Sequence, residues 1–155
     1  MKTKRYWLMK SEPSAYSIDD LAREKASPWE CVRNYQARNF MLHDMKVGDE
    51  VLFYHSNAEP TGIAGLAKVG SEPKPDKTQF DRKSEYFDPK ATKESPRWHC
   101  VDVNFVEKFP RVLDLSLLRE QKSLKDMMLL RKGSRLSIQP VTAEEFACIL
   151  KLAAK

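Results

Sequence analysis

Alternating apolar and polar residues predict several short β-strands along this chain. Successive side chains of a strand point to opposite faces, so a period of two marks a half-buried strand. The pattern is clearest in residues 98–106, where Val101, Val103 and Phe105 alternate with polar positions. Residues 50–56 and 135–141 alternate in the same way and predict two more strands. Residues 5–10, rich in aromatic and large apolar side chains, and residues 62–69 are also read as strands. The small residues of 62–69 also predict that another backbone or a ligand approaches closely.

Helix signals lie between these strands. Residues 34–45 place Ala37, Met41 and Met45 four positions apart, which predicts a helix that ends before Gly48. Residues 115–131 predict one or two short helices with a break near Ser123. Ser17 can cap one more helix, and Thr142 with Glu145 forms a capping box before the last one. The predicted buried stripes of those two helices are Ile18, Leu21 and Ala22, and Phe146, Ile149 and Leu150.

About five strands and four or five short helices alternate in mixed order, which is typical of an α+β domain. The chain has 155 residues, of which 41% are hydrophobic, so it can bury the core of one domain spanning 1–155. Short strands in a domain of this size favour a small, partly closed β-barrel with helices packed outside. Residues 71–96 are rich in proline and charge and read as a long loop, which in compact domains is often functional.

The charge balance favours a polyanionic partner without identifying it. The net charge is +5, and each phosphate that a basic side chain neutralises releases counterions. The three cysteines are isolated and match neither zinc-ligand nor redox spacing, which fits a reducing compartment. No signal peptide or membrane span is recognisable, so we expect a cytoplasmic protein, or a nuclear one in a eukaryote. Membrane partners are not expected.

Most enzyme signatures are missing. The three histidines lack metal-ligand spacing, and no GxSxG elbow occurs. Asp76, Asp81 and Glu85 could bind a divalent cation if the loop folded around it, but a solvated charged loop is the favoured interpretation. We therefore expect no metal and no cofactor.

Several polar and aromatic residues are not explained by core packing and suit base recognition. Aromatic rings stack on a base, Asn and Ser pair with its edge, and Arg and Lys contact phosphates. Each residue also has a structural interpretation. Trp29 and Trp98 could equally be core tryptophans. Tyr35 is more typical of a core, and Asn39 could simply bond a nearby backbone group.

These residues lie in segments that together resemble the EVE domain family, and the resemblance covers nearly the whole chain. The segments begin at Tyr6-Trp7-Leu8-Met9-Lys10-Ser11-Glu12-Pro13 and include the hallmark stretch from Trp29 to Asn39. Further matches are Gly48-Asp49, Phe53-Tyr54-His55-Ser56, Gly62-Ile63-Ala64-Gly65, Tyr86-Phe87-Asp88-Pro89, Pro96-Arg97-Trp98 and residues 135–142. One position departs from the pattern: Cys31 stands where the family usually has Gly, and its Cβ restricts the backbone.

The resemblance implies a PUA-like fold and a pocket for one extruded, modified base, with cytosine derivatives in DNA favoured over RNA. The implied pocket residues are Ser11, Trp29, Arg33, Asn34, Tyr35, Asn39, His55, Ser56, Trp98 and Ser137. The implied phosphate contacts are Lys10, Arg33, Arg38, Arg97 and Arg135. Stacking is expected from Trp29, with Tyr35 or Trp98 as further candidates.

Three functions remain open on the sequence alone. The first is a non-catalytic reader of modified bases, acting as a monomer. The second is a glycosylase or hydrolase that acts on the extruded base, with Glu12 and Lys10 as the candidate groups within the pocket motifs. The third is a protein-interaction module that shares only the fold. Incubation with modified oligonucleotides separates these functions: binding without change supports the reader, released base supports the enzyme, and absence of both supports the interaction module.

Overall fold

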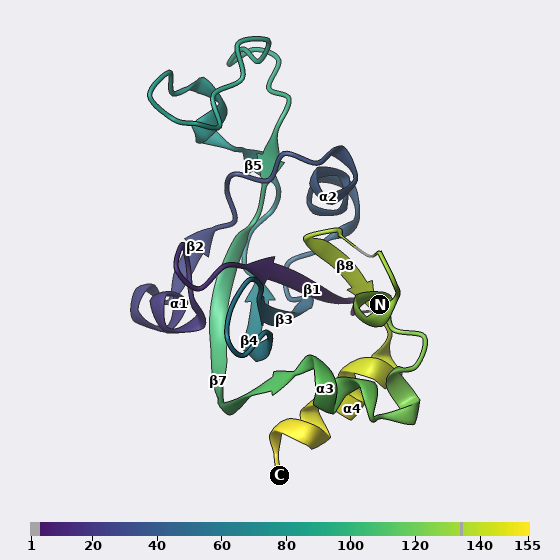
Figure 1. Ribbon diagram of the computed structural model, residues 1–155. Coiled ribbons are helices and arrows are strands. Elements are labelled where there is room, and N and C mark those ends of the chain that lie inside the picture. The colour runs from purple at the N-terminus through teal and green to yellow at the C-terminus, as the bar shows by residue number, and fades with distance from the viewer. Residues whose placement is uncertain (1–3, 134) are drawn as a thin grey trace.

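A curled sheet of six strands organises the computed structural model, which describes residues 4–133 and 135–155 (Figure 1). Neighbouring strands follow the order β2-β7-β4-β3-β1-β8. Strands β1 and β3 are parallel, whereas the other pairs of this sheet are antiparallel. The strands are β1 (Tyr6–Ser11), β2 (Ala26–Pro28), β3 (Glu50–His55), β4 (Gly62–Val69), β7 (Asp102–Asp114) and β8 (Ile138–Val141).

The period of two along the strands divides the core into two clusters. In β1, Trp7 and Met9 belong to one cluster, while Leu8 between them belongs to the other. In β3, Val51 and Phe53 join the first cluster. Because alternate side chains leave the sheet on opposite faces, the sheet has a hydrophobic layer on each side.

Helices cover both layers. The first is covered by α1 (Ile18–Glu24), α2 (Tyr35–Asn39) and the π-helical turn η1 (Phe40–Asp44). The second is covered by α3 (Leu115–Arg119), the 3-10 turns η3 (Lys122–Leu124) and η4 (Met128–Leu130), and α4 (Ala143–Ala153). None of the helices in the described ranges is long and apolar enough to span a bilayer.

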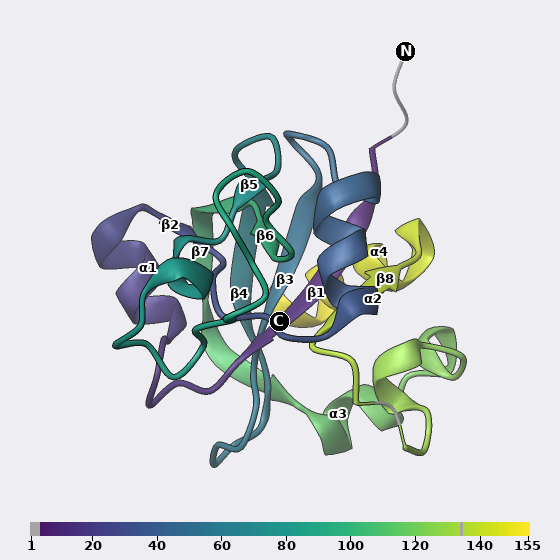
Figure 2. The same cartoon turned by 90° about the horizontal axis from the view of Figure 1, so that it is seen from above.

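A long excursion of the chain leaves the sheet between β4 and β7. It contains β5 (Lys74–Pro75), the 3-10 turn η2 (Lys77–Phe80) and β6 (His99–Cys100), and β5 pairs with β6. In the view of Figure 2 this excursion lies between α1 and α2. The segment predicted as a loop over 71–96 therefore carries short regular elements, and it is bonded to the segment after β2 through Cys31 and Arg33.

Two glycines allow β4 to lie close against β7. A Cβ at Gly62 would fall 2.2 Å from the Leu113 carbonyl oxygen, and one at Gly65 would fall 2.4 Å from that of Glu107. Near both glycines the register between the two strands shifts. Such irregularities bend a strand and increase its twist, which accounts for the curl of the sheet. The close approach predicted for residues 62–69 is confirmed, and the approaching group is a backbone.

The predicted α+β architecture is correct, but several element boundaries differ. The helix predicted over 34–45 divides into α2 and η1, and β7 continues well past residue 106. The three-residue strand β2 was not predicted, because it is too short for a pattern and exists only through pairing with β7. In α4, Leu150 is 38% exposed and Leu152 replaces it in the buried stripe. Ser17 caps α1 and the Thr142–Glu145 capping box forms, both as expected, and Ser17 also forms a capping box with Asp20.

Candidate functional site

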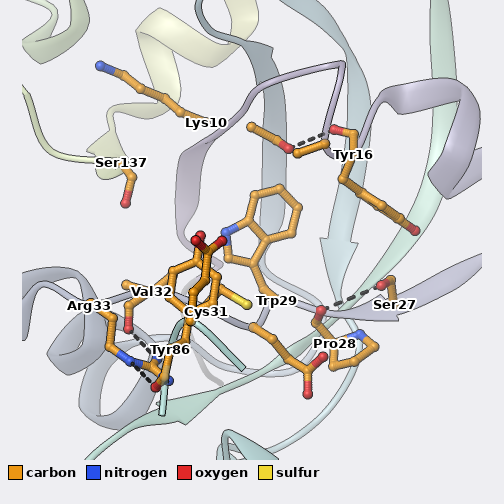
Figure 3. Close-up of a pocket in the computed structure, with 14 residues that line it drawn as sticks. Lys10, Tyr16, Ser27, Pro28, Trp29, Cys31, Val32, Arg33, Tyr86 and Ser137 are labelled. Atoms are coloured by element: carbon orange, nitrogen blue, oxygen red, sulfur yellow. Dashed lines mark hydrogen bonds between the residues drawn. The ribbon is translucent and has the colours of Figure 1, made fainter. Parts of the chain in front are cut away.

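A cavity of about 550 Å³ opens where the end of β1, the segment after β2 and residues 85–86 of the excursion meet (Figure 3). Four of the predicted pocket residues line it: Ser11, Trp29, Arg33 and Ser137. The other lining residues are Lys10, Ala15, Tyr16, Ser27, Pro28, Glu30, Cys31, Val32, Glu85 and Tyr86.

Trp29 forms the central part of the cavity wall (Figure 3). Its backbone N–H donates to the Val101 carbonyl at 2.9 Å, directly after β2 ends at Pro28. The indole is 8% exposed and meets Phe53 of the core edge to face, with ring centroids 5.5 Å apart. Trp29 is thus a core residue on one side and a cavity residue on the other.

The indole N–H separates Trp29 from the other tryptophans. Trp7 Nε1 donates to Asp49 at 3.0 Å, and Trp98 Nε1 donates to Asp88 at 2.8 Å. Within the described ranges, Trp29 Nε1 has no acceptor. This N–H is not among the buried polar atoms that lack a partner, so it is open to the cavity and can donate to a ligand there.

The loop that presents Trp29 is held by a buried carboxylate of the excursion. Asp76 is 1% exposed and accepts from the Cys31 N–H at 2.7 Å, the Thr78 N–H at 2.8 Å and Arg33 Nη1 at 3.3 Å. Cys31 has a φ of 75°, the left-handed region that glycine adopts most readily. The backbone conformation expected of a glycine is therefore retained with cysteine in its place.

Arg33 is engaged entirely within the protein. Nε and Nη2 both donate to the Tyr86 carbonyl, at 3.2 and 2.7 Å, and Nη2 also donates to the Thr78 hydroxyl at 3.0 Å. Nη1 donates to the Val32 carbonyl at 3.0 Å and to Asp76. These bonds account for all five N–H donors of a guanidinium. Arg33 therefore joins the loop after β2 to the excursion and has no donor left for a phosphate.

Trp98 and Tyr35 lie outside the Trp29 cavity. Their rings stack with centroids 4.8 Å apart and an interplanar angle of 15°. Trp98 lines a separate hollow of about 180 Å³ together with Arg33, Tyr86 and Asp88. The Trp98 N–H bond lowers the pKa of Asp88 more than any other interaction.

The remaining predicted pocket residues have bonds within the protein and do not line the cavity. Asn34 caps α2 by accepting from the Ala37 N–H at 2.9 Å. Asn39 Oδ1 accepts from Arg38 at 3.0 and 2.7 Å. His55 Nε2 accepts from the Ile18 N–H at 3.1 Å, and burial lowers the pKa of His55, which favours the neutral, accepting imidazole. The Ser56 N–H donates to the Ser11 carbonyl.

Cations and carboxyl groups both occur at the cavity. Burial lowers the pKa of Lys10 and raises that of Glu30, where the Asp76 carboxylate adds to the effect. Glu85 contributes a second carboxyl group. Among the other predicted phosphate contacts, Arg135 is exposed and Arg38 donates to the Arg97 carbonyl at 2.7 Å.

Several cavity residues were not named as site residues, notably Tyr16, Glu30, Glu85 and Tyr86. Glu30 and Tyr86 lie inside the segments that resemble the family, and this position could have identified them as site residues. No group of His, Cys, Asp or Glu in the described part of the chain could hold a metal ion. Asp76, one residue of the cation alternative, is instead bonded to Cys31, Thr78 and Arg33.

Residues 5–152 match the family model of the EVE domain. This chain belongs to the EVE domain family. Thymocyte nuclear protein 1 of Homo sapiens is 44% identical over 172 residues, covering 97% of this chain and 74% of the relative. Thymocyte nuclear protein 1 of Danio rerio is 45% identical over 168 residues, covering 94% and 71%.

Solved structures of other EVE domain relatives have the same fold. A protein of Leishmania major superposes with a TM-score of 0.92 at 51% identity, covering 98% of this chain and 96% of that chain. Human THYN1 protein in complex with 5-methylcytosine containing DNA gives a TM-score of 0.90 at 42% identity, covering 98% and 99%. The predicted family and its PUA-like α+β fold are confirmed.

Proposed function

We propose that this EVE domain binds nucleic acid and holds one extruded base against Trp29, with a modified cytosine in DNA as the favoured ligand. The observation that carries the proposal is the unpaired indole N–H at the wall of the cavity. The cavity volume of about 550 Å³ falls in the range of small-ligand sites, about 300–1,000 Å³. The ring supplies a stacking surface, and its N–H supplies a donor.

The polar groups of the cavity suit a cytosine. Its exocyclic amino group needs an acceptor, and Glu or Asp side chains commonly supply one. Glu30 and Glu85 provide carboxyl oxygens, and the Ser137 hydroxyl can donate or accept. Human THYN1 protein forms a complex with 5-methylcytosine containing DNA, which is the reason for favouring modified cytosine.

The phosphate contacts proposed here differ in one residue from those that the family resemblance implied. Lys10 lines the cavity and has no carboxylate partner within the described ranges. Arg38, Arg97 and Arg135 complete the proposed set. Arg33 is left out because its five donors hold the loop after β2, and we assign it a positioning role.

An enzyme that removes or hydrolyses the extruded base is the second candidate, and Lys10 is the observation that favours it. Its amine lines the cavity, and burial lowers its pKa, as in amines that act as nucleophiles. Glu12, the other candidate, is bonded to Asn57 and does not line the cavity. We favour binding without turnover, since no activated nucleophile paired with a base is assembled there.

The test is a titration with DNA and RNA oligonucleotides, each carrying cytosine or 5-methylcytosine, in single- and double-stranded form. We expect the modified DNA to bind more tightly and to be recovered unchanged by chromatography. Released base would support the enzyme. Equal, weak binding of all oligonucleotides would support an interaction module instead.

Substitution of Trp29 tests the role of its ring. Trp29→Phe keeps the core packing but removes the donor, and should weaken modified-base binding roughly two- to tenfold with little change in melting temperature. Trp29→Ala should weaken binding roughly ten- to a hundredfold and also lower stability. Trp98→Phe is the matched control, because its N–H is already bonded to Asp88. Unchanged affinity in Trp29→Phe and Trp29→Ala would exclude the indole from the site.

A further inference from the structure

Three aromatic rings and one guanidinium form a column that leads from the Trp29 cavity to the surface. The Arg33 guanidinium carbon lies 5.5 Å from the Tyr86 ring centroid and 5.1 Å from that of Trp98. Trp98 in turn stacks on Tyr35 at 4.8 Å. Tyr86 and Arg33 line the cavity, so the column begins there and ends at Tyr35.

The inner members of the column are fixed by hydrogen bonds. The Trp98 indole N–H donates to Asp88, and its backbone N–H donates to Gln79 Oε1 at 2.9 Å. Gln79 Nε2 and the Asp76 N–H both donate to the Trp98 carbonyl, at 2.7 and 2.9 Å. Trp98 is only 7% exposed. The ring beneath Tyr35 is therefore held rigidly by groups that are themselves bonded.

Tyr35, by contrast, ends the column in solvent. It is the first residue of α2 and is 51% exposed, although its ring is parallel to that of Trp98. The Arg38 guanidinium carbon lies 4.8 Å from the Tyr35 centroid. Three of the five Arg38 N–H groups are bonded to Asn39 and Arg97, which leaves two without a partner within the described ranges.

We propose that the exposed face of Tyr35 stacks on the base of a nucleotide next to the extruded one, while Arg38 contacts the adjoining phosphate. An oriented aromatic ring beside a cation with free donors is the combination that binds unpaired nucleotides without reading their sequence. A nucleotide next to the extruded one lies outside the cavity, and the column joins the cavity wall at Arg33 to the exposed Tyr35. We call Tyr35 and Arg38 the stacking platform. The inference rests on the proposed function, but the platform is a separate subsite because Tyr35 does not line the cavity.

The experiment is a double-mutant cycle that combines a substitution of Tyr35 with removal of a base from the oligonucleotide. Single-stranded DNA carrying 5-methylcytosine is compared with two versions that have an abasic residue on its 5′ or its 3′ side. We expect one abasic version and Tyr35→Leu each to weaken binding roughly five- to a hundredfold. Combined, they should weaken it little more than either alone. Leucine still covers Trp98, and Tyr35→Phe should bind like the unaltered protein.

Independent effects of Tyr35→Leu and of both abasic residues, or no effect of Tyr35→Leu, would overturn the platform. If tight binding still depends on the methyl group and on Trp29 in that case, the proposed function stands. If the cycle shows coupling but neither the methyl group nor Trp29 matters, the platform stands and the base-reading function fails. Absence of any oligonucleotide binding overturns both.

Discussion

The indoles of Trp29 and Trp98 are buried to nearly the same extent but differ in their hydrogen bonds. The two indoles are 8% and 7% exposed, and each contacts another aromatic ring. Around Trp98 the ring N–H and the backbone polar groups have partners in the protein. Around Trp29 the backbone N–H is bonded, whereas the ring N–H lies at the cavity and has no protein acceptor among the described residues. Burial alone therefore does not separate an aromatic residue whose polar atoms are all bonded from one whose N–H is open to a cavity.

Hydrogen-bond partners distinguish the two kinds of buried aromatic residue. A bonded polar group contributes to the fold, and breaking its bond costs folding free energy. A polar group left unpaired at a cavity contributes little to the fold and can contribute to binding. Substitutions around Trp98 should therefore change stability first, and substitutions at the Trp29 cavity should change binding first.

The largest effect should come from Asp76, which ties the two regions together. Asp76→Ala removes the acceptor of the Cys31 N–H and the ionic partner of Arg33, and leaves both unpaired. Removal of one partner from a buried ion pair costs about 3–5 kcal/mol, and urea denaturation should show this loss. Asp81→Ala, in the exposed part of the excursion, is the control and should cost far less. A small loss of stability in Asp76→Ala would mean that the bonds of Asp76 do not stabilise the contact between the two regions.

Arg33→Lys should have the next largest effect, and on folding rather than on phosphate binding. Lysine keeps the charge but cannot reproduce five N–H bonds, so stability should fall by about 2–3 kcal/mol. Where Arg33→Gln, which removes the charge, is folded, the slope of log affinity against log salt concentration should be unchanged. Lys10→Gln provides the contrast, because loss of a phosphate contact should reduce that slope by about 0.7–0.9. A reduced slope in Arg33→Gln would place Arg33 among the phosphate contacts after all.

Trp98→Phe should lower stability by about 1–2 kcal/mol, because it removes the N–H bond to the partly exposed Asp88 carboxylate. That bond depresses the pKa of Asp88 in the folded protein below its ordinary value of 3.8. Its contribution is complete above that value and is lost as pH falls through the folded pKa. The difference between variant and unaltered protein should therefore shrink below about pH 4. Trp29→Phe should show no such pH dependence.

The smallest effect should come from Cys31→Gly at the cavity wall. The left-handed backbone is costly for a residue with a Cβ, so glycine should raise stability by up to about 1 kcal/mol after its greater unfolded-state entropy is subtracted. Lys25→Gly is the matched control, since Lys25 has a φ of 72° but lies outside the cavity. Both substitutions should raise folding stability, and only Cys31→Gly should change oligonucleotide affinity. Loss of stability in Cys31→Gly would show that packing of the thiol outweighs backbone strain.

The sequence by itself determined the features that depend on neighbouring residues. Strand β3 follows from alternation, β1 follows from its run of aromatic and large apolar residues, and the helix caps at Ser17 and Thr142 follow from residues three positions apart. The family follows from short segments spread along the whole chain. Position within those segments also placed Trp29 and Ser11 among the candidate residues that line the cavity. Local patterns suffice for these features because local geometry produces them.

Only the tertiary structure decided which candidates remain open to a ligand. Arg33 is occupied by Asp76 and Tyr86, which lie 43 and 53 positions away, and His55 is occupied by the Ile18 N–H, 37 positions away. These partners meet when the excursion folds against the loop after β2 and when α1 packs on the sheet. Hydrogen bonds between distant segments leave no periodic trace in a sequence. Trp29 and Trp98 therefore look alike along the chain and differ only in the folded protein.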